Sequence, residues 1–169
     1  GSYAGKGYSN HLLEHCISDA KTKGKCGLTI ISADKKRGFL SDPKFLLHKG
    51  FKVIDDAAPY FKLFYLPFTN DAPAPCFKEC AKTGTIEESG LVLYYENQCP
   101  FTDKYAPVLQ EIAKQHNSSV SMHKIETTEQ AQNAPSPFTA YSFYYNGQFV
   151  TQEILSEKKI ETFLTEHGL

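Results

Sequence analysis

Two short apolar runs, each beside a helical pattern, constrain the fold of this chain most strongly. Residues 26–31 (Cys-Gly-Leu-Thr-Ile-Ile) are rich in β-branched side chains and are typical of a buried strand. Residues 91–95 (Leu-Val-Leu-Tyr-Tyr) form a second, continuously apolar strand. Helical patterns lie next to both, at 9–23 and 101–115, because apolar side chains recur there every three or four residues. A chain that alternates strands and helices in this way predicts an α/β fold.

The remaining patterns divide this α/β chain into two small units. Further strands are expected at residues 51–54, 60–68, 120–125, 141–145 and 148–154, and further helices at 42–50, 128–133 and after Ser156. Asn146-Gly147 predicts a hairpin turn between the last two strands. The turn-rich and polar residues 69–90 interrupt the series. We therefore expect one unit at residues 3–68, a linker at 69–90, and a second unit at 91–169.

Composition narrows the classes of function. The 169 residues carry a net charge of −1, so no basic surface is expected to attract nucleic acid or an anionic membrane. No apolar run is long enough to span a bilayer. The five cysteines are sparse and odd in number, which argues against a disulfide framework and for a reducing cytoplasm. We expect no metal site, because no Cys/His cluster has the spacing of a zinc site.

Two glycines and a lysine lead directly into the first helical pattern. Glycine lets the backbone turn tightly, and the first N–H groups of a helix have no internal partner and face an anion favourably. The candidate phosphate-binding residues are Gly5, Lys6, Gly7, Tyr8, Ser9 and Asn10. An ordinary tight turn is the alternative, since the stretch completes neither a Walker loop nor the dinucleotide fingerprint.

The wider stretch 4–13 (Ala-Gly-Lys-Gly-Tyr-Ser-Asn-His-Leu-Leu) resembles the acetyl-CoA pyrophosphate loop of the GNAT acetyltransferases, with Gly7 at the central glycine. Ala4 replaces the Arg or Gln of the family motif, and Ser9 replaces its last Gly or Ala. The order helix, strand, helix, strand, strand in residues 3–68 also follows this loop in GNAT folds. The resemblance implies a partial GNAT (acyl-CoA acyltransferase) fold that transfers acetyl from acetyl-CoA to a small-molecule or peptide amine.

The same resemblance implies that parts of an acetyltransferase site are missing here. The chain starts at Gly1 without an initiator Met, so we expect a piece of a longer protein that also supplies the strand before the loop. This piece alone is expected to bind acetyl-CoA weakly and to be weakly active or inactive. The sheet edge that the missing strand leaves exposed is a candidate homodimer contact.

The catalytic residues of such a site are not identified by the sequence. Leu46 stands where a tyrosine of the family commonly protonates the departing thiolate, and a leucine has no proton to give. Tyr60 and His48 are candidate replacements, although a structural role is the favoured interpretation of each.

Cys99 follows the second apolar strand and opens the helix after it. A helix N-terminus stabilises a thiolate, so Cys99 is a candidate redox thiol. The alternative is that Cys99 is a buried side chain that only packs the start of the helix. Cys-Pro-Phe in this order of elements resembles the thioredoxin and glutaredoxin fold, with Thr102 at the second-cysteine position, which makes the motif monothiol. That fold also places a cis-proline before the hairpin, for which Pro135 and Pro137 are candidates.

The other four cysteines lead to two further expectations. Cys76 and Cys80 are candidates to pair with Cys99, whereas Cys16 and Cys26 are expected in the core.

A GNAT half followed by a thioredoxin-like βαβ-ββα unit ending in Tyr-Tyr-Asn-Gly-Gln-Phe-Val-Thr resembles the YoaP-type acetyltransferases over nearly the whole chain. Three interpretations stay open: an acetyltransferase, a monothiol redox or thiol-binding module centred on Cys99, and a non-catalytic interaction fragment.

Overall fold

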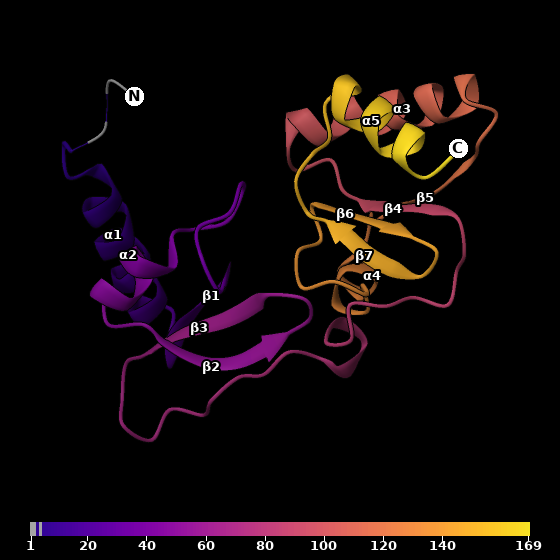
Figure 1. Cartoon of the computed structure of the whole chain (residues 1–169). Coiled ribbons are helices and arrows are strands. Elements are labelled where there is room, and N and C mark those ends of the chain that lie inside the picture. The colour runs from indigo at the N-terminus through magenta and orange to yellow at the C-terminus, as the bar shows by residue number, and fades with distance from the viewer. Residues whose placement is uncertain (1–2, 4) are drawn as a thin grey trace.

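The computed structural model describes residue 3 and residues 5–169, which fold around two separate sheets (Figure 1). The first sheet has the order β1 (Gly27–Ala33), β3 (Phe61–Pro67), β2 (Lys52–Ala57), and both of its strand pairs are antiparallel. Helices α1 (Tyr8–Thr22) and α2 (Pro43–His48) lie side by side against it. A cluster of Leu46, Phe51 and Phe64 fills the space beneath these helices.

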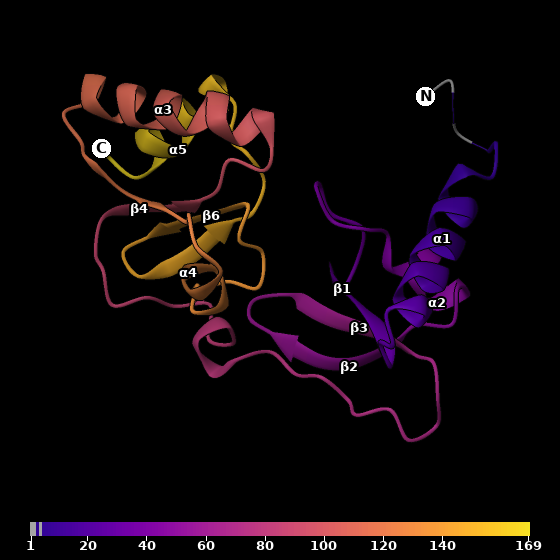
Figure 2. The ribbon, with the colours of Figure 1, turned by 180° about the vertical axis from the view of Figure 1, so that it is seen from behind.

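The second sheet has the order β5 (Val120–Lys124), β4 (Leu91–Tyr95), β6 (Tyr141–Tyr145), β7 (Gln148–Thr151). Strands β4 and β5 are parallel, and the other neighbouring pairs are antiparallel. Helices α3 (Pro100–Gln115) and α5 (Glu157–Glu166) cover one face, and the short α4 (Thr128–Gln132) lies on the opposite side (Figure 2). The protein is therefore a mixed α/β structure with two sheets.

Local sequence accounts for the second sheet. Its core side chains Leu93, Leu109, Phe143 and Leu164 are at most 1% exposed and come from one sheet face and the two covering helices. The expected hairpin turn is confirmed at 146–147, where both central residues have positive φ, 47° and 79°. The strands and helices expected in residues 91–169 all form, in the expected order.

A hydrogen-bond network around the buried side chain of Gln152 connects the two halves of the chain. Gln152 is 1% exposed, and its side chain accepts from the Tyr60 hydroxyl and donates to the Gly38 carbonyl at 3.1 Å. The Gly38 N–H donates to Glu153 Oε1, also at 3.1 Å. The Arg37 guanidinium lies 3.5 Å from the centroid of the Tyr60 ring. Both backbone polar groups of Gly38, in the loop after β1, are thus held by residues that follow β7.

The 69–90 segment also connects the two sheets. The Phe77 ring packs in a cluster with Phe61, and the Phe77 N–H donates to Asp55 Oδ2 of β2 at 2.8 Å. This N–H lowers the pKa of Asp55. Further along, the backbone N–H of Ile86 donates to the Gly147 carbonyl at 2.9 Å. The segment therefore contacts β2 and the β6–β7 hairpin, and it contains the short helix η1 (Glu79–Ala81).

Two sequence expectations about packing and backbone were wrong. Cys16 and Cys26 are exposed, because only Ala20 of the apolar side chains of α1 is buried and Cys26 precedes β1 at the end of the sheet. Neither Pro135 nor Pro137 follows a cis peptide bond; among the described residues the cis bond is Ala58–Pro59. The chain turns after Pro135 with the help of the Ser136 hydroxyl, which accepts from the Phe138 N–H at 3.2 Å.

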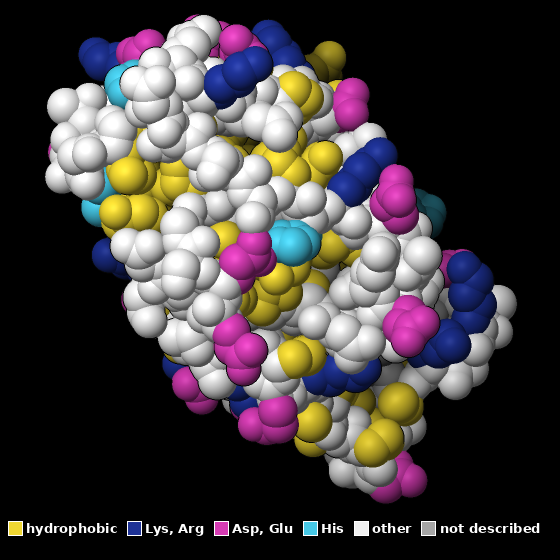
Figure 3. Space-filling view, turned by 90° about the vertical axis from the view of Figure 1, so that its right-hand side faces the viewer, with side chains coloured by type: hydrophobic (Ala, Val, Ile, Leu, Met, Phe, Trp, Pro, Cys, Tyr) yellow, Lys and Arg dark blue, Asp and Glu magenta, His cyan; other side chains and the backbone are white. Residues whose placement is uncertain are grey.

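The surface has no dominant charge on the side seen in Figure 3, where acidic and basic side chains alternate around small hydrophobic patches. This mixture agrees with the net charge of −1. Over residue 3 and residues 5–169, no helix has both the length and the apolar character needed to cross a membrane.

Candidate functional sites

The glycine turn at the start of α1 has the backbone geometry of an exposed helix N-terminus. Gly5 and Gly7 have φ values of 77° and 81°, in the left-handed region that favours glycine. The Gly7 carbonyl accepts from the N–H of Asn10 at 3.0 Å, so the N–H groups of Tyr8 and Ser9 precede the first intrahelical bond. Within the described chain no side chain caps this end. These amides are therefore available to an anion.

A pocket of about 300 Å³ lies at this turn. Its lining residues are Tyr3, Gly5, Gly7, Tyr8, Ser9 and Asn10. Five of the six predicted phosphate-binding residues therefore come together. The sixth, Lys6, does not line the pocket; its ammonium lies 5.5 Å from the centroid of the Tyr3 ring. Ala4 lies outside the described residues.

The turn leaves space for a ligand and favours a negative one. A Cβ built on Gly5 or Gly7 would meet nothing within 4 Å. The first turn of α1 contains no acidic residue, so nothing there opposes the positive end of the helix dipole. The arrangement can bind a phosphate group through backbone N–H groups.

Neither Leu46 nor the two candidate proton donors, Tyr60 and His48, lies at the turn that begins α1. Leu46 is 2% exposed and packs in the core of the first sheet. The Tyr60 hydroxyl is engaged with Gln152, and burial raises the pKa of Tyr60. His48 is exposed in the last turn of α2. None of the three lines the pocket at the start of α1.

Cys99 occupies the N-cap position of α3, with Pro100 as the first helical residue. The Cys99 carbonyl accepts from the Thr102 N–H at 3.0 Å, and the thiol is partly buried. Thr102 is fully buried, and its hydroxyl has no hydrogen-bond partner among the residues described. Asp103 in the same first turn adds a negative charge that works against a thiolate at this helix end.

The two candidate partners of this thiol, Cys76 and Cys80, do not pair with it. All five cysteines are free. The Cys80 Sγ instead lies 3.9 Å from the carbonyl of Gln132 at the end of α4. In the described part of the chain no group of three or more metal-ligating side chains is found.

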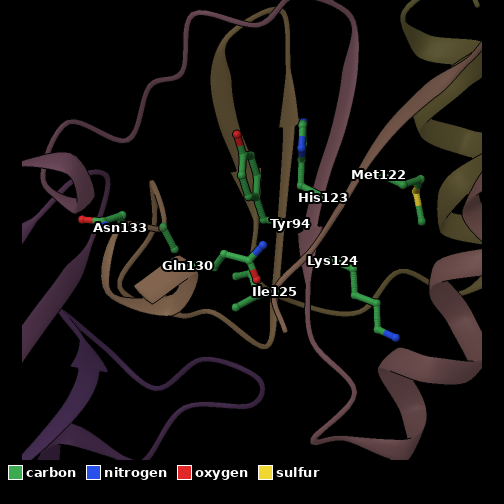
Figure 4. Close-up of a pocket in the computed structure, with 8 residues that line it drawn as sticks. Tyr94, Met122, His123, Lys124, Ile125, Gln130 and Asn133 are labelled. Carbon is green, nitrogen blue, oxygen red and sulfur yellow. The ribbon is translucent and has the colours of Figure 1, made fainter. Parts of the chain in front are cut away.

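A further pocket, not anticipated from the sequence, lies where β5 meets α4 (Figure 4). It has a volume of about 480 Å³. His123 of β5 stacks on Tyr94 of β4, and its Nε2 lies 2.7 Å from Glu88 Oε2. Hydrogen bonds from Ser121 and then His123 lower the pKa of Glu88. From the sequence, this pocket could have been located only by pairing Tyr94 with His123, and that pairing depends on the register of β4 and β5.

Comparison with known proteins first identifies a class of domain. Residues 120–162, which run from β5 into α5, match a family model described as YoaP-like. The chain therefore contains a YoaP-like domain.

A particular relative extends the match to both sheets. The chain is 38% identical over 164 residues to a Bacillus subtilis (strain 168) protein named "Uncharacterized N-acetyltransferase YoaP". The alignment covers 97% of this chain and 65% of that protein. The two proteins are homologous, and about a third of the relative's length has no counterpart in this chain.

Proposed function

We propose that this chain is part of a GNAT-type N-acetyltransferase, which moves an acetyl group from acetyl-CoA to an amine. The observation that carries the proposal is the exposed glycine turn of α1, which presents free backbone N–H groups to a pocket. The homologous protein named as an N-acetyltransferase supports the same activity class. In this proposal residues 3–68 supply the second half of the acetyltransferase domain.

The first sheet supports this assignment by its order. The elements α1, β1, α2, β2 and β3 follow the glycine turn in the order that the GNAT resemblance implies. Strand β1 is an edge strand, paired only with β3 among the described residues. Its free edge can receive a further strand, either from additional sequence or from a second copy in a homodimer.

The role of this chain in the reaction is to hold the acyl donor. The pyrophosphate would accept hydrogen bonds from the N–H groups of Tyr8 and Ser9, with Lys6 adding positive charge. The amine nitrogen attacks the thioester carbonyl carbon, and collapse of the oxyanion breaks the C–S bond. The departing CoA thiolate takes up the proton that the amine nitrogen loses. We assign no proton-transfer residue to this chain.

The pyrophosphate itself provides the test. Isothermal titration should show that acetyl-CoA binds, while acetylpantetheine, which lacks the pyrophosphate and the nucleotide, does not. Lys6→Ala should weaken acetyl-CoA binding about two- to fivefold, the range of an exposed ion pair. Lys104→Ala is the matched control, because Lys104 also lies over a tyrosine ring, that of Tyr105. Equal binding of the two compounds would refute the assignment.

A second candidate function concerns Cys99. The sheet order β5-β4-β6-β7, with Cys99 between β4 and α3, supports a thioredoxin-like second unit with a monothiol site. If Cys99 is such a thiol, iodoacetamide at pH 6 should modify it faster than the exposed Cys16. Slower modification of Cys99, read by peptide mass spectrometry, would remove this candidate.

A further inference from the structure

We propose that the pocket between β5 and α4 binds a small planar aromatic compound that carries a hydrogen-bond acceptor on its rim. This pocket is formed by the second sheet and α4, and it shares no residue with the pocket at the start of α1. The inference does not depend on the proposed acetyltransferase activity.

The floor of the pocket is a stack of aromatic rings that ends at the sheet edge. The Tyr144 ring meets the Tyr94 ring edge-on at 5.9 Å, and Tyr94 stacks on His123 at 4.6 Å with 19° between the planes. Tyr94 covers one face of the imidazole, and β5 is the edge strand, so the other face points outward. The His123 side chain is 43% exposed. A planar ring can extend this stack by one layer.

The outermost ring of the stack is held in place. The Glu88 carboxylate binds His123 Nε2 at 2.7 Å and so restrains rotation of the imidazole. A surface that is already ordered loses less conformational entropy when a ligand binds. The Glu88–His123 contact therefore makes His123 a better stacking surface than a freely rotating side chain.

The wall of the pocket offers hydrogen-bond donors. Gln130 Oε1 already accepts from the N–H groups of Glu126 and Thr127, at 2.7 and 3.0 Å. Its amide nitrogen remains to donate, and Figure 4 shows this nitrogen directed toward Tyr94. Lys124 also lines the pocket, but Figure 4 shows its ammonium directed away from Tyr94, and this ammonium lies 3.2 Å from Glu126. A ligand with an acceptor such as a carbonyl oxygen on its rim matches the N–H donors of the Gln130 amide.

Two neutral amides of similar size test the proposal on the full chain. Benzamide is planar, whereas cyclohexanecarboxamide carries the same carboxamide on a puckered ring. In titrations of the ¹⁵N-labelled protein, benzamide should produce saturable shifts centred on Tyr94, His123 and Gln130. Cyclohexanecarboxamide should bind markedly more weakly, because it cannot stack.

Two variants distinguish the contribution of stacking on His123 from that of the hydrogen bond donated by Gln130. His123→Ala should weaken benzamide binding about tenfold, the usual loss when a stacking side chain is truncated. The control His167→Ala removes a histidine that also stacks on an aromatic ring, that of Phe163, but lies outside this pocket. Gln130→Glu keeps the oxygen that caps α4 and removes the donor, so it should weaken both amides equally.

Three results would overturn the proposal. They are equal affinity for the two amides, unchanged benzamide binding by His123→Ala, and shifts that centre on residues 5–10 instead of the β5 edge. Should His123→Ala unfold the protein, the comparison of the two amides on the unmodified chain decides the matter alone.

Discussion

Replacing Gln152 with leucine should measurably destabilise the whole chain. Gln152 is 1% exposed and bonds the Tyr60 hydroxyl and the Gly38 carbonyl, which belong to the other half of the sequence. Leucine keeps most of the volume but leaves both groups without their partner. An unsatisfied buried group costs about 1–3 kcal/mol. Because Gly38 is itself exposed and water can replace one bond, we expect a total loss of about 2–3 kcal/mol in the free energy of unfolding.

Urea unfolding measures this loss. Circular dichroism is the suitable probe, because the chain has no tryptophan whose fluorescence could be monitored. With a urea dependence of about 2 kcal/mol per molar, the midpoint should fall by about 1–1.5 M. Gln110→Leu is the matched control; Gln110 is exposed on α3, and its replacement should change stability by less than about 0.5 kcal/mol.

A double-mutant cycle makes the same prediction sharper. Tyr60→Phe removes the hydroxyl that Gln152 accepts from, so the effects of Tyr60→Phe and Gln152→Leu should be non-additive by about 0.5–3 kcal/mol. Strict additivity, or a Gln152→Leu midpoint equal to that of the parent protein, would refute the view that this network couples the two sheets.

Two other predictions concern the segment that contacts both sheets. Gly147→Ala should lower the midpoint of thermal unfolding by about 4–8 °C, which corresponds to about 2 kcal/mol. The reasons are that φ at Gly147 is 79° and that a Cβ there would lie 2.7 Å from the Ile86 carbonyl oxygen. The control Gly24→Ala, at a position with positive φ but no such contact, should lower the midpoint less. Asp55→Asn should destabilise the chain at pH 7, because the Phe77 N–H holds the Asp55 pKa below its usual value. The contribution of a carboxylate with a lowered pKa is present above its unfolded pKa and is lost as the pH falls through the folded one. The difference between Asp55→Asn and the parent should therefore shrink below about pH 4, and a constant difference from pH 7 to pH 3 would contradict this cause.

Local sequence patterns were sufficient to predict the order of the helices and strands. Apolar periodicity marked α3 and α5, and the Asn-Gly pair marked the β6–β7 turn, because each signal lies within a few residues. The same reasoning failed for Cys16, since a stripe on a helix shows which face is apolar but not whether another element covers it.

Local sequence patterns could not predict contacts between residues that are far apart in the chain. Gln152 is polar, and no local pattern indicates that it is buried, yet it is 1% exposed and bonds Tyr60 and Gly38 of the first half of the chain. The pocket at β5 depends on the register that places His123 beside Tyr94. The glycine turn could be predicted because its residues, 5–10, are adjacent in the sequence.

Mapping by nuclear magnetic resonance can show whether the turn at residues 5–10 binds the pyrophosphate of CoA, as we propose. Titrating CoA into the ¹⁵N-labelled chain should shift the amide signals of residues 5–10 first. Gly7→Ala should greatly reduce these shifts, whereas Gly24→Ala, a comparable change just beyond the other end of α1, should not. CoA shifts that leave residues 5–10 unmoved, or that survive Gly7→Ala unchanged, would contradict the account.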